Sequence, residues 1–201
     1  MITKGVPPSR ALEGRGASAL VEAFFELNQL KLLFRQGWLR QGISEARCES
    51  VAEHIFSMAV LGWWIADAHF SELDRDRMLR MVLVHELGEI STGDVTPSDG
   101  MAPEEKQRLE REGFRNVVRN LPRAEEYMAL WEEFEAGETP EARFTRQLDR
   151  LEMAFQAAVY EAQDLGEVMQ QFFASASAAL HDPILRGIFE EIEKIRVQST
   201  K

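Results

Sequence analysis

Two histidines and two carboxylates stand in sequence positions that suit metal chemistry. His85 and Glu86 directly follow the apolar run Met78–Val84. Two further candidates lie far away in the sequence, so that the full set is His54, His85, Glu86 and Asp149. Two imidazoles and two carboxylates suit a divalent first-row ion, with coordination positions left for water and substrate. The sequence alone leaves open whether the helices that carry these residues meet.

Each of these residues also has an ordinary structural interpretation. A histidine on an apolar helix face, such as His54, is more often a hydrogen-bonded core residue than a ligand. A mid-helix aspartate such as Asp149 is more often paired with a surface arginine. Glu86 and Glu89 would be costly to bury without a positive charge nearby. Residues 81–105 contain no lysine or arginine, so a metal ion is the favoured source of that charge.

Helical patterns run through the first half of the chain. Apolar residues recur every three or four positions over residues 17–34, which predicts an amphipathic helix. Ser50 and Glu53 have the spacing of a capping box, so a second helix begins there with His54 in its first turns. Asp74 can cap a third helix, which we expect to carry His85 and Glu89 on one face.

The second half of the chain is also helical in pattern. Pro103 opens a highly charged helix whose glutamates we expect to be solvated, and Pro122 opens another. Thr139 and Pro140 cap the helix that carries Asp149, and two helices close the chain. We find no strand alternation and no repeat. The sequence therefore predicts an all-α, single-domain helical bundle of about seven or eight helices over residues 17–198, preceded by a flexible tail at 1–16.

Composition excludes several classes of function. A net charge of −11 disfavours a general nucleic-acid or anionic-membrane binder, although a small phosphorylated ligand needs only a local basic patch or a metal. Cys48 is the only cysteine of the 201 residues, so no internal disulfide can form and a reducing compartment is favoured. Residues 1–16 resemble neither a signal peptide nor a membrane span. We therefore expect a cytoplasmic protein.

A basic and aromatic segment follows the first predicted helix. Arg35, Trp38, Arg40 and Arg47 lie in or beside a loop broken by glycines. Such a segment could hold a phosphate together with a base or sugar. By residue type alone, solvated arginines and one core tryptophan are the more common outcome.

Three blocks of sequence together resemble a known family. They are residues 49–54 (ESVAEH), 85–97 (HELGEISTGDVTP) and 147–153 (QLDRLEM). In this order they resemble the HD-domain superfamily of metal-dependent phosphohydrolases, and they look like the signature blocks of its 5′-deoxynucleotidase branch. The resemblance extends from about Leu27 to Ile195. It implies removal of phosphate from deoxyribonucleoside 5′-monophosphates, with one divalent metal ion (Mn, Co, Fe, Zn or Mg), in a protein that commonly forms a homodimer.

The resemblance also assigns roles to individual residues. The metal ligands fall on His54, His85, Glu86 and Asp149, the essential acidic residues on Glu89 and Asp94, and the phosphate- and sugar-binding pair on Arg35 and Trp38. One position departs from the family, because Glu86 stands where the family has aspartate. Its extra methylene moves the carboxylate by about one bond length, ~1.5 Å, where a catalytic site tolerates roughly 0.5 Å.

These assignments imply hydrolysis of a phosphomonoester. A bound metal would hold a phosphate oxygen and activate the attacking water, while Glu89 orients that water or handles a proton. Asp94 would contact the sugar or assist the leaving group, Arg35 would neutralise the phosphate, and Trp38 would pack against C2′. The alternatives are a regulatory protein that binds nucleotide or metal but has lost catalysis through Glu86, and a hydrolase of a different phosphoester.

Overall fold

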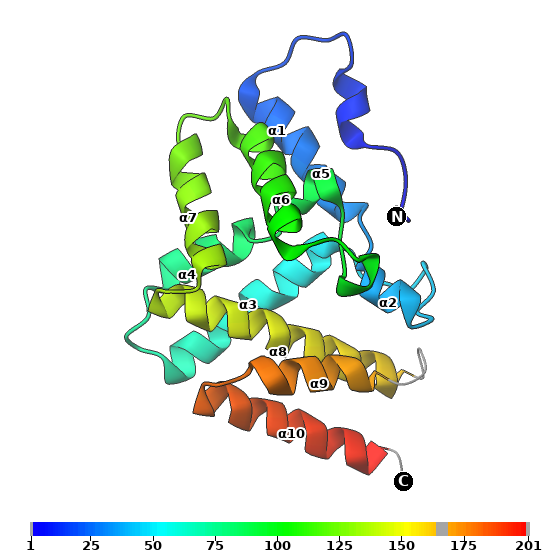
Figure 1. Cartoon of the computed structure of the whole chain (residues 1–201), viewed down its shortest axis with the longest axis vertical. Helices are drawn as coiled ribbons and strands as arrows, with labels where there is room; N and C mark the ends of the chain where they lie inside the picture. The colour runs from blue at the N-terminus through cyan, green and yellow to red at the C-terminus, as the bar shows by residue number, and fades with distance from the viewer. Residues whose placement is uncertain (1, 164–168, 200–201) are drawn as a thin grey trace.

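The computed structural model describes residues 2–163 and 169–199, and helices account for its regular structure (Figure 1). Within the described ranges the α-helices are α1 (Ala19–Leu27), α2 (Gln36–Arg40), α3 (Val51–His69), α4 (Arg75–Val84), α5 (Glu89–Thr92), α6 (Pro103–Val118), α7 (Ala124–Ala136), α8 (Pro140–Ala162), α9 (Gln170–Ala179) and α10 (Pro183–Ser199). Short 3-10 helices add η1 (Pro8–Leu12), η2 (Asn28–Lys31) and η3 (Pro97–Asp99). The all-α prediction is confirmed, and only α2 and α5 are very short.

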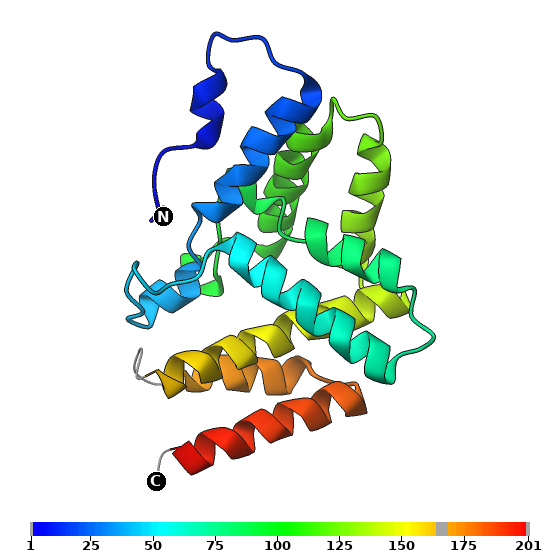
Figure 2. The ribbon, with the colours of Figure 1, turned by 180° about the vertical axis from the view of Figure 1, so that it is seen from behind.

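The long helix α8 is the centre of the bundle. It packs against α3, α4 and α7 on one side and against α9 and α10 on the other. In Figure 1, α8, α9 and α10 lie as a stack at the lower end, with α1, α6 and α7 at the upper end. Figure 2 shows α3 and α4 between these two groups. Because α3, α4 and α8 carry or directly precede the motif residues, their mutual packing determines whether a site forms.

A glycine permits α3 and α8 to pack closely. A Cβ atom added at Gly62 would lie only 2.4 Å from Cδ2 of Leu148, which is fully buried. Met78 of α4 completes this contact, since its sulfur would lie 3.5 Å from the same Cβ. The close contact brings the helix of His54 alongside the residue that precedes Asp149.

The predicted helix starts are present in the structure. Ser50 accepts a hydrogen bond from the backbone N–H of Glu53, and the Glu53 carboxylate accepts one from the backbone N–H of Ser50, so the capping box is complete. Asp74 caps α4, and Thr139 caps α8. These caps depend on residues a few positions apart, which explains why the sequence could identify them.

The first predicted helix is shorter than expected. Helix α1 ends at Leu27, a 3-10 turn follows, and Phe34 forms an isolated β-bridge with Ser50. The chain therefore bends before the segment that contains Arg35. Phe24, one of the apolar residues in the pattern over residues 17–34, is 54% exposed, because only part of α1 is covered by α6 and the 3-10 helices.

Residues in the predicted N-terminal tail have defined contacts. The backbone N–H of Lys4 donates to the carbonyl of Leu32 (2.8 Å), and the Gln36 side chain donates to the carbonyl of Ile2 (3.0 Å). These bonds place part of the tail beside the start of α2. The domain boundary at residue 17 stays a prediction.

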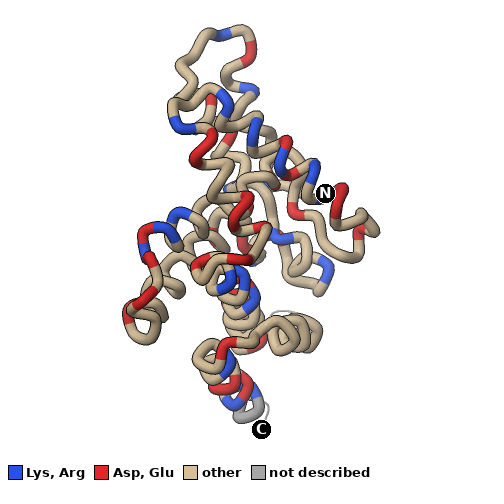
Figure 3. The backbone as a smooth tube through the Cα atoms, turned by 60° about the vertical axis from the view of Figure 1, so that its left-hand side comes forward, with Lys and Arg blue, Asp and Glu red and all other residues tan. Residues whose placement is uncertain are grey.

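Acidic and basic residues are interspersed over much of the chain (Figure 3). Several form exposed ion pairs, such as Arg111 with Glu132 and Arg108 with Glu105. Such pairs contribute little to stability individually. Among the described helices, none combines the length and the apolar composition that crossing a bilayer requires.

Candidate metal centre and active site

The histidine–glutamate pair lies at a break between two helices. Helix α4 ends at Val84, His85 is its C-cap, and α5 begins at Glu89. We expected one continuous helix face to carry His85 and Glu89, so this detail was wrong. Because of the break, His85 and Glu86 project from a turn and Glu89 from the first residue of α5, rather than all three from one straight helix face.

The structure brings the four predicted ligand positions together. His54, His85, Glu86 and Asp149 each offer one ligand atom, and these atoms all lie within 4.8 Å of one another. The Nε2 atoms of His54 and His85 are buried and make no hydrogen bond with the described residues. The Oδ1 atom of Asp149 lies 3.3 Å from Nε2 of His54. Buried nitrogen lone pairs facing two carboxylates are what a divalent cation requires. The donor set therefore fits a metal ion.

Glu86 reaches the cluster despite its longer side chain. Its Oε1 lies 3.6 Å from Nε2 of His85 and 3.2 Å from a terminal nitrogen of Arg35. Arg35 lies 3.4 Å from Asp94 as well, and its side chain is mostly buried. The guanidinium thus sits between two carboxylates at the edge of the cluster.

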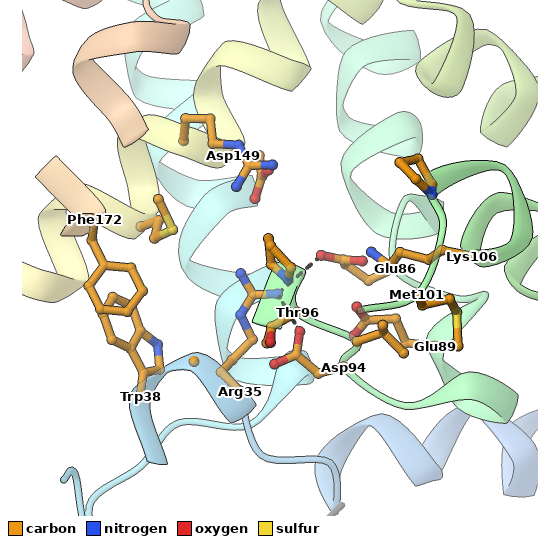
Figure 4. A pocket seen from close by; sticks show the side chains of 16 residues that line it. Arg35, Trp38, Glu86, Glu89, Asp94, Thr96, Met101, Lys106, Asp149 and Phe172 are labelled. Atoms are coloured by element: carbon orange, nitrogen blue, oxygen red, sulfur yellow. Dashed lines mark hydrogen bonds and ion pairs between the residues drawn. The ribbon is translucent and has the colours of Figure 1, made fainter. Parts of the chain in front are cut away.

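A cavity of about 470 Å³ opens beside this cluster. Figure 4 shows its lining, with Trp38 and Phe172 on one flank, Glu86, Glu89 and Lys106 on the other, and Arg35 with Asp94 between them. Glu89 and Asp94, the two predicted catalytic residues, line it together with Arg35 and Trp38, the predicted substrate-binding pair. The volume is that of a small-molecule site.

Asp94 is held at the start of α2. Its Oδ2 accepts a short hydrogen bond from the backbone N–H of Gln36, and its Oδ1 faces Arg35. Gly93 precedes it with a φ of +75°, a conformation that favours glycine. The glycine turn therefore aims Asp94 at the arginine from a distant part of the chain.

Trp38 belongs to an aromatic wall. Its ring centroid lies 4.1 Å from that of Phe172 and 5.4 Å from that of Tyr160. Its indole N–H donates to Glu49 (2.7 Å), which satisfies the polar edge of the ring. Trp38 is thus a core residue and also part of the cavity lining, so both interpretations of this position apply.

Comparison with known proteins identifies the family. A model of the HD domain matches residues 27–188. The chain belongs to the HD domain family. The human protein named 5′-deoxynucleotidase HDDC2 is 35% identical over 193 residues, covering 94% of this chain and 91% of that protein. The family resemblance inferred from the three motif blocks is confirmed.

Solved structures share the HD-domain fold. The PH0347 protein from Pyrococcus horikoshii is 26% identical with a TM-score of 0.73, covering 87% of this chain and 98% of that one. A predicted metal-dependent phosphohydrolase from Magnetospirillum magnetotacticum is 26% identical with a TM-score of 0.70, covering 90% and 95%.

The two histidines of this HD domain are in different electrostatic environments. Burial and Arg35 disfavour a charged His54, but Glu152 and Asp149 outweigh them and raise the pKa of His54 to about 10. Burial lowers the pKa of His85, and the carboxylates of Glu86 and Asp149 only partly oppose this. Without a metal, His54 therefore carries a proton at neutral pH and His85 does not.

The acidic residues of the HD domain are also differentiated. Burial raises the pKa of Glu89 well above its ordinary value, and the negative charges of Glu86 and Asp94 add to this. Burial alone would raise the pKa of Glu86 as well. The positive charges of His85, when it is protonated, and of Arg35 outweigh burial and lower the pKa of Glu86. Of these two groups, Arg35 is always charged. Neighbouring carboxylates with opposite shifts are typical of acid–base pairs in catalysis.

Sequence reasoning placed Arg35 at this site but missed its contact with Glu86, and it missed Lys106 altogether. Arg35 contacts Glu86 directly, and Lys106 of α6 lines the same cavity as Glu86 and Glu89. The sequence argument that favoured a metal ion as the source of positive charge considered only neighbours in sequence, and Arg35 and Lys106 supply positive charge here as well. Glu110, which we expected to be solvated, is 8% exposed and lies 3.2 Å from Lys106. No pattern in the charged helix distinguishes these two residues from the others.

Proposed function

We propose that this chain is a metal-dependent phosphomonoesterase that removes phosphate from deoxyribonucleoside 5′-monophosphates. The observation that carries the proposal is the convergence of His54, His85, Glu86 and Asp149 beside a cavity with an arginine in its wall. The human relative is named for the same activity, which adds support.

In this proposal the four converging side chains hold one divalent ion. A bound ion would supply Lewis-acid stabilisation of the phosphate and a water that deprotonates near neutral pH. The remaining steps belong to the chain. Arg35 binds a phosphate oxygen through its second guanidinium edge while Glu86 and Asp94 hold it in place.

Proton handling falls to Glu89. Its carboxyl is buried, with Oε2 making no hydrogen bond to the described residues, and burial raises its pKa, which favours the protonated form. A carboxyl of this kind can donate to the departing sugar oxygen or exchange a proton with the attacking water. Asp94, which also lines the cavity, is close enough to Arg35 to orient it and the sugar end of the substrate.

The aromatic wall supports selectivity for deoxyribose. Trp38 and Phe172 pack against each other at one flank of the cavity, opposite Glu86 and Glu89. A sugar with its phosphate near Arg35 would place C2′ against this apolar surface. A 2′-hydroxyl there would be desolvated without a partner, which costs about 1–3 kcal/mol.

The direct test is phosphate release from matched deoxy- and ribonucleoside 5′-monophosphates with Mn²⁺, Co²⁺ or Mg²⁺. We expect turnover with at least one metal and a preference for deoxy substrates. An Arg35→Ala variant is expected to lose activity while keeping its bound metal. Nucleotide binding without turnover under any metal would favour the regulatory alternative instead.

We also propose that the chain forms a homodimer. Phe56, Trp63 and Trp64 of α3 are 70%, 51% and 66% exposed, and their spacing places them on one helix face. Exposed aromatic groups of this size commonly mark a protein interface. Light scattering should give twice the chain mass for the wild type and a smaller mass for Trp64→Glu. A monomeric wild type would contradict the proposal.

A cytoplasmic location stays a prediction from the single cysteine.

A further inference from the structure

Two buried carboxylates lie beside His54 of the metal cluster. Glu49 is 9% exposed and Glu152 is 3% exposed. Together with His54, each offers a ligand atom within 4.8 Å of the others. Neither carboxylate lines the cavity beside the cluster. Two acidic groups buried side by side are costly unless each has a specific partner.

Glu152 has such a partner in His54. Its Oε2 lies 2.6 Å from Nδ1 of His54, so the ring donates from Nδ1 to the carboxylate. This bond leaves Nε2 as the nitrogen that faces Asp149 and the cluster. His85 shows the same arrangement with a neutral acceptor, because its Nδ1 donates to the carbonyl of Val82 at 2.7 Å. Both rings therefore present Nε2 to the same point.

Glu49 has a different partner. Its Oε1 accepts the indole N–H of Trp38 at 2.7 Å. Its backbone N–H donates to the hydroxyl of Tyr160, whose ring also packs against Trp38. Glu49 thus holds Trp38 of the aromatic wall, whereas Glu152 holds His54.

These contacts argue against a second metal site at Glu49, His54 and Glu152. The Nδ1 atom of His54 is already bonded to Glu152, and one oxygen of Glu49 is bonded to Trp38. An ion would have to break both bonds, and neither glutamate lines the cavity beside the cluster. We therefore interpret Glu49 and Glu152 as residues that hold Trp38 and His54 in position.

We propose that Glu152 is a positioning residue that fixes the tautomer and orientation of His54 for metal binding, and that Glu49 positions Trp38. The inference rests on the proposed function only in taking the cluster as a metal site. A carboxylate bonded to a ligating histidine orients the ring and raises its basicity, and losing such a partner typically costs 10–100-fold in metal affinity. Glu49 should affect substrate binding and leave metal affinity unchanged.

The test compares Co²⁺ binding by the full chain in three variants. We expect Glu152→Gln to bind Co²⁺ about 10–100-fold more weakly, with an altered visible absorption spectrum and unchanged circular dichroism. Glu49→Leu should keep wild-type Co²⁺ affinity and spectrum but raise KM. Phe144→Leu, a change in the core of the same helix that packs on Phe70, controls for general loss of stability.

Two results would overturn the proposal. One is wild-type affinity and spectrum in Glu152→Gln. The other is an equal loss of Co²⁺ affinity in Phe144→Leu, since that would make the effect one of stability. The Co²⁺ readouts do not use the reaction, so they test Glu152 even if the wild type hydrolyses no nucleotide.

Discussion

Gly88 is the point at which a single methyl group should damage the site most. It lies in the turn between His85 and α5, and a Cβ atom there would lie 2.8 Å from both Cα and the carbonyl oxygen of Glu110 in α6. Its φ of −61° and ψ of −32° are helical values that alanine adopts readily. The cost of Gly88→Ala would therefore come from the collision with α6 alone.

The size of the effect follows from these distances. Ordinary van der Waals contact begins at 3.4 Å, so the turn and α6 must separate by roughly 0.6 Å at the closest backbone atoms. No rotamer change can relieve a contact with backbone. Overpacking of this kind costs about 1–3 kcal/mol. The shift exceeds the roughly 0.5 Å that a catalytic constellation tolerates, so kcat/KM should fall about 10–100-fold.

Thermal unfolding and steady-state kinetics on the same variant check both values. The matched control is Gly187→Ala in α10, where an added Cβ would meet no atom within 4 Å. Alanine in a helix interior is about 0.5–1 kcal/mol more favourable than glycine, so this control should be slightly stabilised and fully active. Unchanged stability and kcat/KM in Gly88→Ala would refute the argument that α6 fixes the turn.

Three other changes test the cluster. Glu86→Gln keeps the size of the side chain but removes its charge, so the amount of metal retained after dialysis should fall by at least about tenfold. Full metal content in this variant would exclude Glu86 as a ligand. In the metal-free protein the pKa of His54 is raised to about 10, so protonated His54 stabilises the fold. This contribution to stability is lost as the pH rises through about 10. Metal binding needs the neutral form, so Co²⁺ affinity should rise ~tenfold per pH unit near neutrality with release of one proton, measurable in a weakly buffered titration. Arg35→Lys keeps the charge but not the fork, so KM should rise about 10–100-fold while the melting temperature measures any structural loss.

Local patterns predicted the helices well where the deciding residues are neighbours in sequence. The Ser50–Glu53 capping box, the Asp74 cap and the Thr139 cap each involve residues three positions apart, and each is present. The order of the three motif blocks along the chain could likewise be taken directly from the sequence. The four candidate ligands could be named because their types and order resemble a family, whereas their convergence depends on α3–α8 packing.

Other features depend on which surfaces meet, and periodicity does not contain that information. The apolar stripe of α1 predicted a buried face, but Phe24 is exposed because neighbouring elements cover only part of that helix. Glu110 was expected in solvent by composition, and it is buried because Gly88 allows α6 to approach the turn closely. Nothing in the helical pattern of residues 140–162 distinguishes Glu152, which the fold places against His54.

The glutamate at position 86 is compatible with the site because of where its backbone lies. Glu86 lies two residues after the end of α4, in the turn before α5, so its side chain does not start from a fixed helix face. Its carboxylate joins the ligand cluster and contacts Arg35 at 3.2 Å. That contact supplies a second constraint on the longer side chain, which reduces the freedom that the extra methylene introduces. The substitution therefore changes how the carboxylate is held, and Arg35 joins the ligand cluster to the wall of the cavity through it.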